Sequence, residues 1–237
     1  MSKPFQFKQF TVQQDKCAMK VSTDSVLLGA WADLAGNPSS ILDIGAGTGL
    51  LALMLAQRSQ ATQIDAIEID EEAYEQCVDN FENSPWNDRL FCYHASLNEF
   101  VKEMDERYDL IISNPPFYIE NVSSGNASRD KARQNKALPF EELIESVYEL
   151  LSESGTFNIV IPYKEEASFV KIARDNGLFL KRITRVKGQP DSYLKRSFLE
   201  FGFYQYIYPV DELIIEKSRH NYTSKYIDLT KDFYLKM

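Results

Sequence analysis

The chain has 237 residues, of which 44% are hydrophobic, and its 35 acidic and 26 basic side chains give a formal net charge of −9. This size suits one large α/β domain, and the apolar fraction is that of a folded globular protein. No apolar run reaches the roughly 18–20 residues that cross a bilayer. Because the first ten residues also lack the basic start and apolar core of a secretory signal, we expect a cytoplasmic protein.

The charge is unevenly distributed along the chain. Residues 1–120 carry 8 basic against 19 acidic side chains, a balance of −11, whereas residues 121–237 carry 18 against 16, a balance of +2. The overall acidity argues against a general nucleic-acid coat protein. The second half can still contact a polyanion.

The cysteines and histidines offer little chemistry. Cys17, Cys77 and Cys92 are far apart and form no CxxC pair, which disfavours a disulfide framework and a thiolate zinc site. The two histidines, His94 and His220, are too few for a histidine-rich metal centre, and no GxSxG motif accompanies them. We therefore expect neither a metal site nor a Ser-His-Asp hydrolase.

The chain begins with a small flap and a helix. Residues 5–12 partly alternate between apolar and polar, which predicts short β-strands. Residues 24–32 follow as a helix with Thr23 or Asp24 as its cap. A loop signal near residue 38 separates this segment, 1–38, from a core of residues 39–237. We expect all of it to form a single domain.

Beyond that loop, short apolar runs alternate with helical patterns. This alternation predicts a Rossmann-like α/β fold, a mostly parallel sheet with helices on both faces. Residues 180–186 and 198–208 have no strong helix between them and predict a closing antiparallel hairpin, which brings the sheet to seven strands. The other expected strands are 41–44, 64–69, 90–93, 108–112 and 157–161, and the expected helices are 49–58, 71–81, 140–151 and 164–176.

A glycine-rich turn joins the first strand of the core to its helix, over Asp43–Leu50. Glycines let the backbone pass close under a ligand, and the helix start presents free N–H groups. The pattern is GxGxG rather than the dinucleotide fingerprint GxGxxG, and an acid precedes it by two residues. S-adenosylmethionine (SAM) has no pyrophosphate and needs an acid near its cationic end. We therefore assign Asp43, Gly45, Gly47, Gly49 and Leu50 to a SAM site, and the alternative is a plain strand–helix connection.

Two further residues complete this expected site. Glu68 ends the second strand, where a carboxylate can accept both hydroxyls of a ribose. Asp70 is the alternative, but we expect it to cap the following helix. After the third strand, Ser96 stands where an acid would usually meet the adenine, and its hydroxyl is our candidate for that contact.

The fourth strand ends in Asn114-Pro115-Pro116-Phe117, at the edge where α/β sheets bind ligands. A planar exocyclic or amide nitrogen is a poor nucleophile because its lone pair is delocalised. The Asn114 side-chain oxygen and the Pro115 carbonyl can accept its two N–H bonds and aim the lone pair at the methyl of SAM. The prolines stiffen the turn, and the ring of Phe117 would stack on the base. The alternative is a turn that merely ends a strand.

At this point the sequence resembles the bacterial tRNA1(Val) (adenine-37-N6)-methyltransferase family, which belongs to the class I SAM-dependent methyltransferases. The glycine turn and NPPF are shared by many N-methyltransferases, whereas the N-terminal stretch and the C-terminal tail are more restrictive. The matching segments are 7–10, 17–21, 23–24, 27–32, 43–57, 84–86, 109–117, 221–223 and 233–235.

The resemblance implies methyl transfer to N6 of adenine 37 in the anticodon loop of a tRNA, with the base turned out of its stack. It also implies that Lys20, Thr23 and Asp24 lie over the SAM site. The chain departs from the family pattern at Ser22, where glycine is usual, and at Phe117, where tyrosine is common. Both departures look tolerable, because stacking needs only a ring.

Two groups of basic residues are candidates for RNA contact. The first lies in the long polar segment 118–138, which has no predicted structure and follows the catalytic turn directly. The second surrounds the expected hairpin, where Tyr193 or Phe198 can stack on a base. The alternative for each residue is a solvated surface charge. The candidates are Arg129, Lys131, Arg133 and Lys136 in the loop, and Lys195 and Arg196 among a hairpin group that also holds Lys181, Arg182, Arg185 and Lys187.

Three competing functions share parts of this pattern. A protein glutamine N5-methyltransferase uses the same NPP-aromatic chemistry, but those enzymes carry a sizeable helical N-terminal domain. An rRNA guanine N2-methyltransferase poses the same chemical problem and stays open. A non-catalytic SAM- or RNA-binding protein would not need an intact Asn114–Phe117 turn. We take a monomer as the default oligomeric state.

Overall fold

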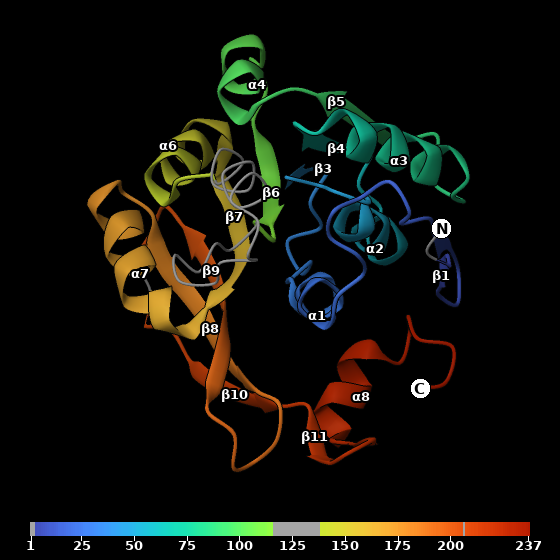
Figure 1. The fold of residues 1–237 in the computed structure, drawn as a ribbon. Coiled ribbons are helices and arrows are strands. Elements are labelled where there is room, and N and C mark those ends of the chain that lie inside the picture. The colour runs from blue at the N-terminus through green and yellow to red at the C-terminus, as the bar shows by residue number, and fades with distance from the viewer. Residues whose placement is uncertain (1–2, 116–137, 206) are drawn as a thin grey trace, which may run out of the picture.

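The computed structural model describes residues 3–115, 138–205 and 207–237 (Figure 1). In this part of the chain, one sheet of eight strands has the order β10-β8-β9-β7-β6-β3-β4-β5. The strands are β3 Ser40–Ile44, β4 Gln63–Glu68, β5 Leu90–His94, β6 Tyr108–Ser113, β7 Leu151–Pro162, β8 Phe179–Lys187, β9 Leu194–Gly202 and β10 Val210–Ile214.

The predicted mostly parallel sheet with a closing antiparallel hairpin is confirmed. Of these strands, only β9 runs antiparallel to its neighbours, β7 and β8. The strand count is eight rather than seven, because β10 adds to β8 in parallel at the edge of the sheet. Sequence patterning missed β10 because its first three residues, Val210, Asp211 and Glu212, are exposed. Only Leu213 is buried, which is too little to give an apolar period.

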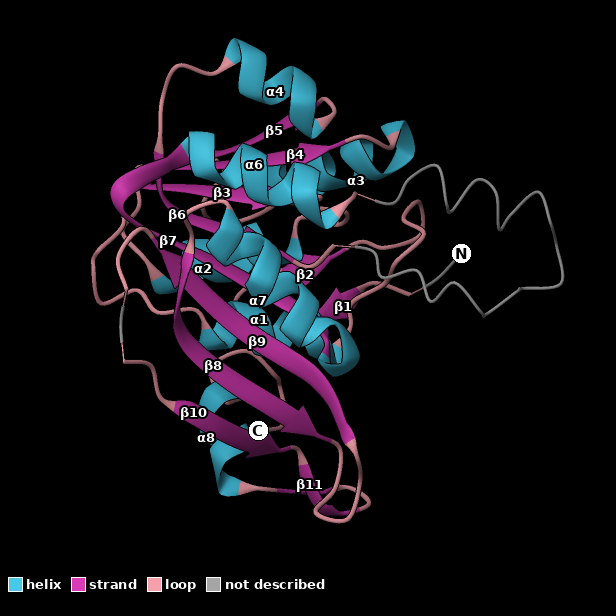
Figure 2. Ribbon diagram, turned by 90° about the vertical axis from the view of Figure 1, so that its left-hand side faces the viewer, coloured by secondary structure: helices cyan, strands magenta, loops and turns pink. Residues whose placement is uncertain are grey.

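Helices cover both faces of the sheet, as expected. Helices α1, α2, α3 and α8 pack on one face around a core that includes Leu28, Leu53 and Phe81. Helices α4, α6 and α7 pack on the other around Leu143, Phe169 and Leu199, and α6 and α7 lie in front of the sheet in Figure 2. The bounds are α1 Thr23–Trp31, α2 Leu50–Arg58, α3 Glu71–Glu82, α4 Leu97–Glu103, α6 Phe140–Leu150, α7 Glu166–Asp175 and α8 Ser224–Thr230.

Three local predictions need correction. Helix α1 is capped by neither Thr23 nor Asp24, because the Ser22 hydroxyl accepts the backbone N–H of Ser25. The short helices α4 and α8 were not predicted, since seven residues give too few apolar positions to show a helical period. Strand β7 also begins six residues before the predicted 157, through the polar segment 151–156.

The two ends of the chain meet. Strands β1 (Phe5–Gln6) and β2 (Thr11–Val12) form the predicted N-terminal flap. Phe7 pairs with Tyr234, and the Lys8 backbone N–H donates to the Phe233 carbonyl at 2.9 Å. These contacts bring the first and last described segments of the chain together.

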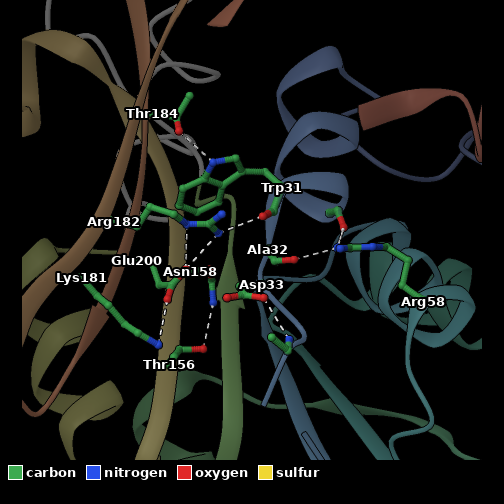
Figure 3. A network of polar contacts seen from close by, with 12 residues as sticks. Trp31, Ala32, Asp33, Arg58, Thr156, Asn158, Lys181, Arg182, Thr184 and Glu200 are labelled. Atoms are coloured by element: carbon green, nitrogen blue, oxygen red, sulfur yellow. Dashed lines mark hydrogen bonds and ion pairs between the residues drawn. The ribbon is translucent and has the colours of Figure 1, made fainter. Parts of the chain in front are cut away.

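A polar network fixes the far end of α1 to the sheet (Figure 3). The Arg182 guanidinium lies 3.7 Å from the centre of the Trp31 ring and donates to the Trp31 carbonyl at 2.9 Å. The indole N–H of Trp31 donates to the Thr184 hydroxyl at 2.9 Å. Glu200, only 2% exposed in its side chain, binds both Lys181 and Arg182. Helix α1 is therefore held firmly at its carboxyl end, while its amino end reaches the site described next.

Candidate cofactor pocket and catalytic turn

A pocket of about 340 Å³ opens at the carboxyl ends of β3, β4 and β6. Its volume lies within the range of about 300–1,000 Å³ that is typical for small-molecule sites. Strands β4 and β6 flank β3, so the order of strands reverses here, and α/β sheets bind ligands at such a switch point. Its lining includes Gly45, Gly47, Glu68, Ile69, Asn114 and Pro115.

The glycine turn forms the floor of this pocket. Gly45, Gly47 and Gly49 all adopt the left-handed conformation, with φ of 72°, 55° and 76°. A Cβ on Gly45 or Gly47 would meet nothing within 4 Å, so both face open space. At Gly49 a Cβ would approach Cys77 Sγ to 2.8 Å and collide with Phe81. The first two glycines therefore leave room for a ligand, and the third, with the buried Leu50, serves packing.

Glu68 is fixed beside this floor. One carboxylate oxygen accepts the Gly47 N–H at 2.8 Å, and the other accepts the Asp70 N–H at 2.9 Å. The residue is 9% exposed and lines the pocket. Asp70 caps α3 through the Ala73 N–H, which confirms that prediction. The Glu68 carboxylate is thus pre-oriented by backbone groups on both sides.

Asp43 lies beneath the turn rather than in the pocket wall. Its side chain is fully buried; one oxygen accepts the Ala52 N–H at 3.2 Å, and the other has no partner among the described residues. Burial raises the pKa of this carboxyl to about 7, although the Ala52 N–H opposes the shift. An unmet acceptor of this kind favours a positive charge nearby.

The candidate catalytic turn, which begins with Asn114 and Pro115, lies directly beside the glycine turn. Strand β6 pairs with β3, and the Ser113 hydroxyl donates to the Ile44 carbonyl at 2.8 Å, which ties the two strand ends together. Asn114, 8% exposed, lines the pocket with Pro115, and its amide Nδ2 donates to the Ser25 hydroxyl at 2.8 Å. The other two residues of the motif, Pro116 and Phe117, lie outside the described residues.

Residues 17–19 form one wall of the pocket, next to the positions that the resemblance implied. Lys20 and Thr23 are exposed, and Asp24 forms an ion pair with Arg196 at 2.7 Å. Cys17 is buried in this wall, and burial raises the pKa of its thiol to about 12, which leaves it unreactive near neutral pH. The pocket wall thus begins three residues before Lys20.

Sequence reasoning missed the residues that hold this wall in place. Asn80 on α3 accepts the Gln13 backbone N–H at 2.8 Å, and Gln76 accepts that of Lys16 at 2.9 Å. Both amides are buried. Their spacing of four residues puts them on one face of α3, and two uncharged polar residues on a buried helix face were the available signal.

Ser96 has a structural role in this conformation. Its hydroxyl accepts the Glu99 N–H and contacts the Glu99 carboxylate at 2.6 Å, which forms a capping box at the start of α4. Its neighbours Ala95 and Leu97, rather than Ser96, line the pocket. With Ile69, they give the pocket an apolar side that no sequence motif indicated.

The basic candidates differ in how they are placed. Lys195 is exposed near the turn of the β8–β9 hairpin, and Tyr193 beside it is 92% exposed. Arg196 is engaged with Asp24. Phe198 is 1% exposed and packs against Trp31, so the suggestion that it stacks on a base is wrong. The remaining hairpin cations form ion pairs with acidic side chains: Lys181 and Arg182 with Glu200, Arg185 with Glu166, and Lys187 with Glu212.

Four predicted RNA contacts cannot be placed. Arg129, Lys131, Arg133 and Lys136 all fall in residues 116–137, outside the described part of the chain. Within the described residues, no cluster of three or more His, Cys, Asp or Glu side chains is arranged to hold a metal ion. None of the described helices is both long and apolar enough to cross a membrane.

Comparison with known proteins now adds to this geometry. The Methyltransferase small domain family matches residues 22–174. The tRNA1(Val) (adenine(37)-N6)-methyltransferase of Flavobacterium psychrophilum is 63% identical over 233 residues, which cover 98% of this chain and all of the relative. The chain belongs to the tRNA1(Val) (adenine(37)-N6)-methyltransferase family. The Bacteroides fragilis member of this family is 46% identical over the full length of both chains.

Solved structures support the fold. Protein Atu636 of Agrobacterium tumefaciens, described as a predicted O-methyltransferase, aligns with a TM-score of 0.68 at 20% identity, covering 89% of this chain and 96% of that one. The TYW2 protein of Pyrococcus horikoshii, solved in complex with MeSAdo, aligns at 0.57 and 15% identity, covering 84% and 69%. At these identities the likeness shows the architecture alone.

Proposed function

We propose that this protein transfers the methyl group of SAM to N6 of adenine 37 in the anticodon loop of tRNA1(Val). One observation carries the proposal: Asn114 and Pro115, at the end of β6, line the same pocket as Gly45, Gly47 and Glu68. The relatives that match over the whole chain are named for this activity. The cofactor half and the acceptor half of such a reaction thus lie within one small pocket.

The pocket suits SAM, which supplies an electrophilic methyl on a sulfonium when bound. Gly45 and Gly47 leave open space above the floor, and the fixed Glu68 carboxylate is suited to accept ribose hydroxyls. The apolar side near Ile69 and Leu97 is suited to a flat adenine ring. The fully buried Asp43 supplies an acceptor for positive charge beneath the turn.

The acceptor nitrogen would be activated by two oxygens. The Asn114 Oδ1 and the Pro115 carbonyl accept the two N6–H bonds of a flipped adenine, which draws the lone pair out of the ring plane and toward the methyl. The N–C bond forms as the sulfur–methyl bond breaks. The nitrogen then carries a positive charge and releases its extra proton to solvent, so no strong general base is required. Phe117 would stack on the ring.

RNA contacts would extend from this site along one edge of the sheet. Because β8 runs parallel to β6 through two antiparallel pairings, the β8–β9 turn lies at the same edge as Asn114. A second turn, between β11 (Glu216–Ser218) and β12 (Asn221–Tyr222), lies beside it, because Glu216 N donates to the Gly188 carbonyl at 2.9 Å. Their exposed side chains, Tyr193, Lys195, Lys217, Arg219 and His220, offer cations and an aromatic surface to an RNA backbone.

The cellular setting follows from the same chemistry. Every group that this mechanism uses belongs to one copy of the chain, so the proposed reaction needs no second subunit and we propose activity as a monomer. Anticodon-loop modification of a tRNA also supports a cytoplasmic location. The four basic residues of the 118–138 segment, next in the chain to the catalytic turn, would meet the anticodon stem as the base enters.

The decisive test uses purified protein, methyl-labelled SAM and total tRNA from a strain that lacks the enzyme, followed by nucleoside analysis. We expect label in N6-methyladenosine, mapped to position 37. Label in a guanosine would keep the fold and the catalytic turn but break the substrate assignment. Absence of label in tRNA, with label in a glutamine of a protein substrate, would overturn the RNA assignment altogether.

A further inference from the structure

The side chain of Asn114 is held from the side by helix α1. Its amide Nδ2 lies 2.8 Å from the Ser25 hydroxyl, although the two residues are separated by 89 positions in the chain. A terminal amide rotates over two nearly isosteric orientations, which exchange a hydrogen-bond acceptor for two donors. Only the orientation with Oδ1 toward the pocket can accept an N–H from a substrate.

Ser25 does not act alone. Its hydroxyl lies 3.0 Å from that of Ser22, which in turn accepts the Ser25 backbone N–H at 3.1 Å as the cap of α1. When the Ser25 hydroxyl donates to Ser22, its oxygen remains free to accept, and Asn114 Nδ2–H fills that place. The helix cap and the amide thus share one continuous hydrogen-bond network.

We infer that Ser25 is a positioning residue that sets the orientation of the Asn114 amide and turns its oxygen toward the acceptor nitrogen. This inference rests on the proposed function, because it assigns Ser25 a role only through Asn114. The support is rigid: Trp31, at the other end of the same helix, is tied to Thr184 and Arg182 (Figure 3). Ser25 therefore cannot follow the amide if it rotates.

The consequence for turnover is a change in population rather than in chemistry. Without the Ser25 oxygen, the amide samples the orientation that presents Nδ2 to the pocket, where two donors would face the donors of the substrate nitrogen. Only the remaining fraction of molecules is competent. We expect about a tenfold loss in kcat, as for one lost hydrogen bond to a neutral group, with little change in SAM affinity.

The test compares Ser25→Val with Ser25→Thr, which are nearly isosteric but differ in the hydroxyl. We expect Ser25→Val to lower kcat about tenfold and Ser25→Thr to restore it to within about twofold of wild type. The KM for SAM and the Tm should be matched between the two variants. Equal rates for Val and Thr would overturn the inference, since only the oxygen distinguishes them.

A double-mutant cycle separates this inference from the proposed function. If Ser25 acts through Asn114, Ser25→Val should cost almost nothing more in an Asn114→Ala background. An additive loss would show that Ser25 acts elsewhere and overturn the inference while leaving the function intact. If the wild type forms no N6-methyladenosine in tRNA, the proposed function fails first, and the inference fails with it.

Discussion

Two regions at the carboxyl ends of the parallel strands are built in different ways. On the β3–β4 side, the pocket is made by backbone geometry, three left-handed glycines and one carboxylate that two N–H groups hold in place. On the β8–β10 side, the surface is made by long charged side chains, and most of the hairpin cations are paired with acidic side chains of the protein itself. A small cofactor needs fixed contacts, whereas a large polyanion needs charge spread over an area.

This contrast also explains the charge asymmetry of the sequence. The acidic first half contributes Glu68 and Asp70 to the pocket lining, and negative charge there suits a cationic ligand rather than a polyanion. The second half is nearly neutral because its cations serve two purposes, internal ion pairs and surface contacts. Net charge alone therefore hides the residues that can meet RNA.

The largest effect should come from the point where the two regions meet. Asn114→Ala removes the oxygen that we propose as the acceptor of the substrate N–H, and we expect kcat to fall about 10²-fold or more while SAM binding changes much less. Single-turnover rates at saturating SAM and tRNA, with SAM affinity by calorimetry, would measure both. Turnover near that of wild type would remove Asn114 from the mechanism.

On the cofactor side, the buried Asp43 should make the stability of the protein depend on pH. Burial raises the pKa of Asp43 to about 7 from its ordinary 3.8, so the folded protein keeps a proton that the unfolded chain has released. Its free energy of unfolding therefore falls as pH rises from about 4 to about 7. The Asp43→Asn variant has no carboxyl to titrate at this position, so it should not lose this stability as the pH rises.

Without SAM, the Tm of Asp43→Asn minus that of wild type should increase between about pH 5 and about pH 8. The expected increase is about 4–8 °C, equivalent to about 2 kcal/mol. Thermal melts at several pH values measure it. A difference in Tm that is constant across this range would contradict the raised pKa.

Glu68→Gln should separate the fixed contacts to SAM from the diffuse contacts to tRNA. This change keeps the shape but removes the charge that strengthens hydrogen bonds to a ribose, and we expect SAM binding to weaken about tenfold. Affinity for tRNA should stay unchanged. The matched control is Glu72→Gln, which changes an exposed acid in the first turn of α3. It should leave both affinities at wild-type values.

The smallest single effects are expected on the RNA side, because each phosphate contact contributes little. We expect Arg129→Ala with Arg133→Ala, and separately Lys195→Ala, to weaken tRNA binding several-fold while sparing SAM binding. Each phosphate contact removed should reduce the slope of log K against log salt by about 0.7–0.9. Lys102→Ala, exposed at the end of α4, is the control. An unchanged salt slope would refute the contact in question.

Sequence reasoning worked best where one short segment contains a whole structural device. The glycine turn and Asp70 as a helix cap were readable because each joins a strand to a helix within a few residues. The Asn114-Pro115 turn was readable because its motif directly follows the apolar strand β6. It worked less well where partners come from distant segments. Nothing local shows that Asp24 engages Arg196 or that Ser25 meets Asn114. The Ser96–Glu99 pair is different, because its Ser-x-x-Glu spacing is a local capping-box signal that the sequence analysis overlooked.

The edge strand β10 was missed for a related reason. β10 is recognisable only through its pairing with β8, since a strand with one solvated side and exposed acids has no periodic apolar signal. The prediction for Phe198 was wrong for the opposite reason. An aromatic residue beside basic residues suggested base stacking, but strand alternation turns its side chain inward against Trp31. Burial, rather than residue type, decided both outcomes.

The meeting of the two chain ends has a consequence for synthesis on the ribosome. Lys8 contacts the carbonyl of Lys231, 223 positions later, so the flap cannot dock until almost the entire chain has emerged. The Cys17–Met19 wall follows the flap in the chain. It is therefore the last part of the pocket to be fixed in place. A nascent chain can thus complete its parallel strands early, while a closed cofactor pocket is reserved for the finished protein.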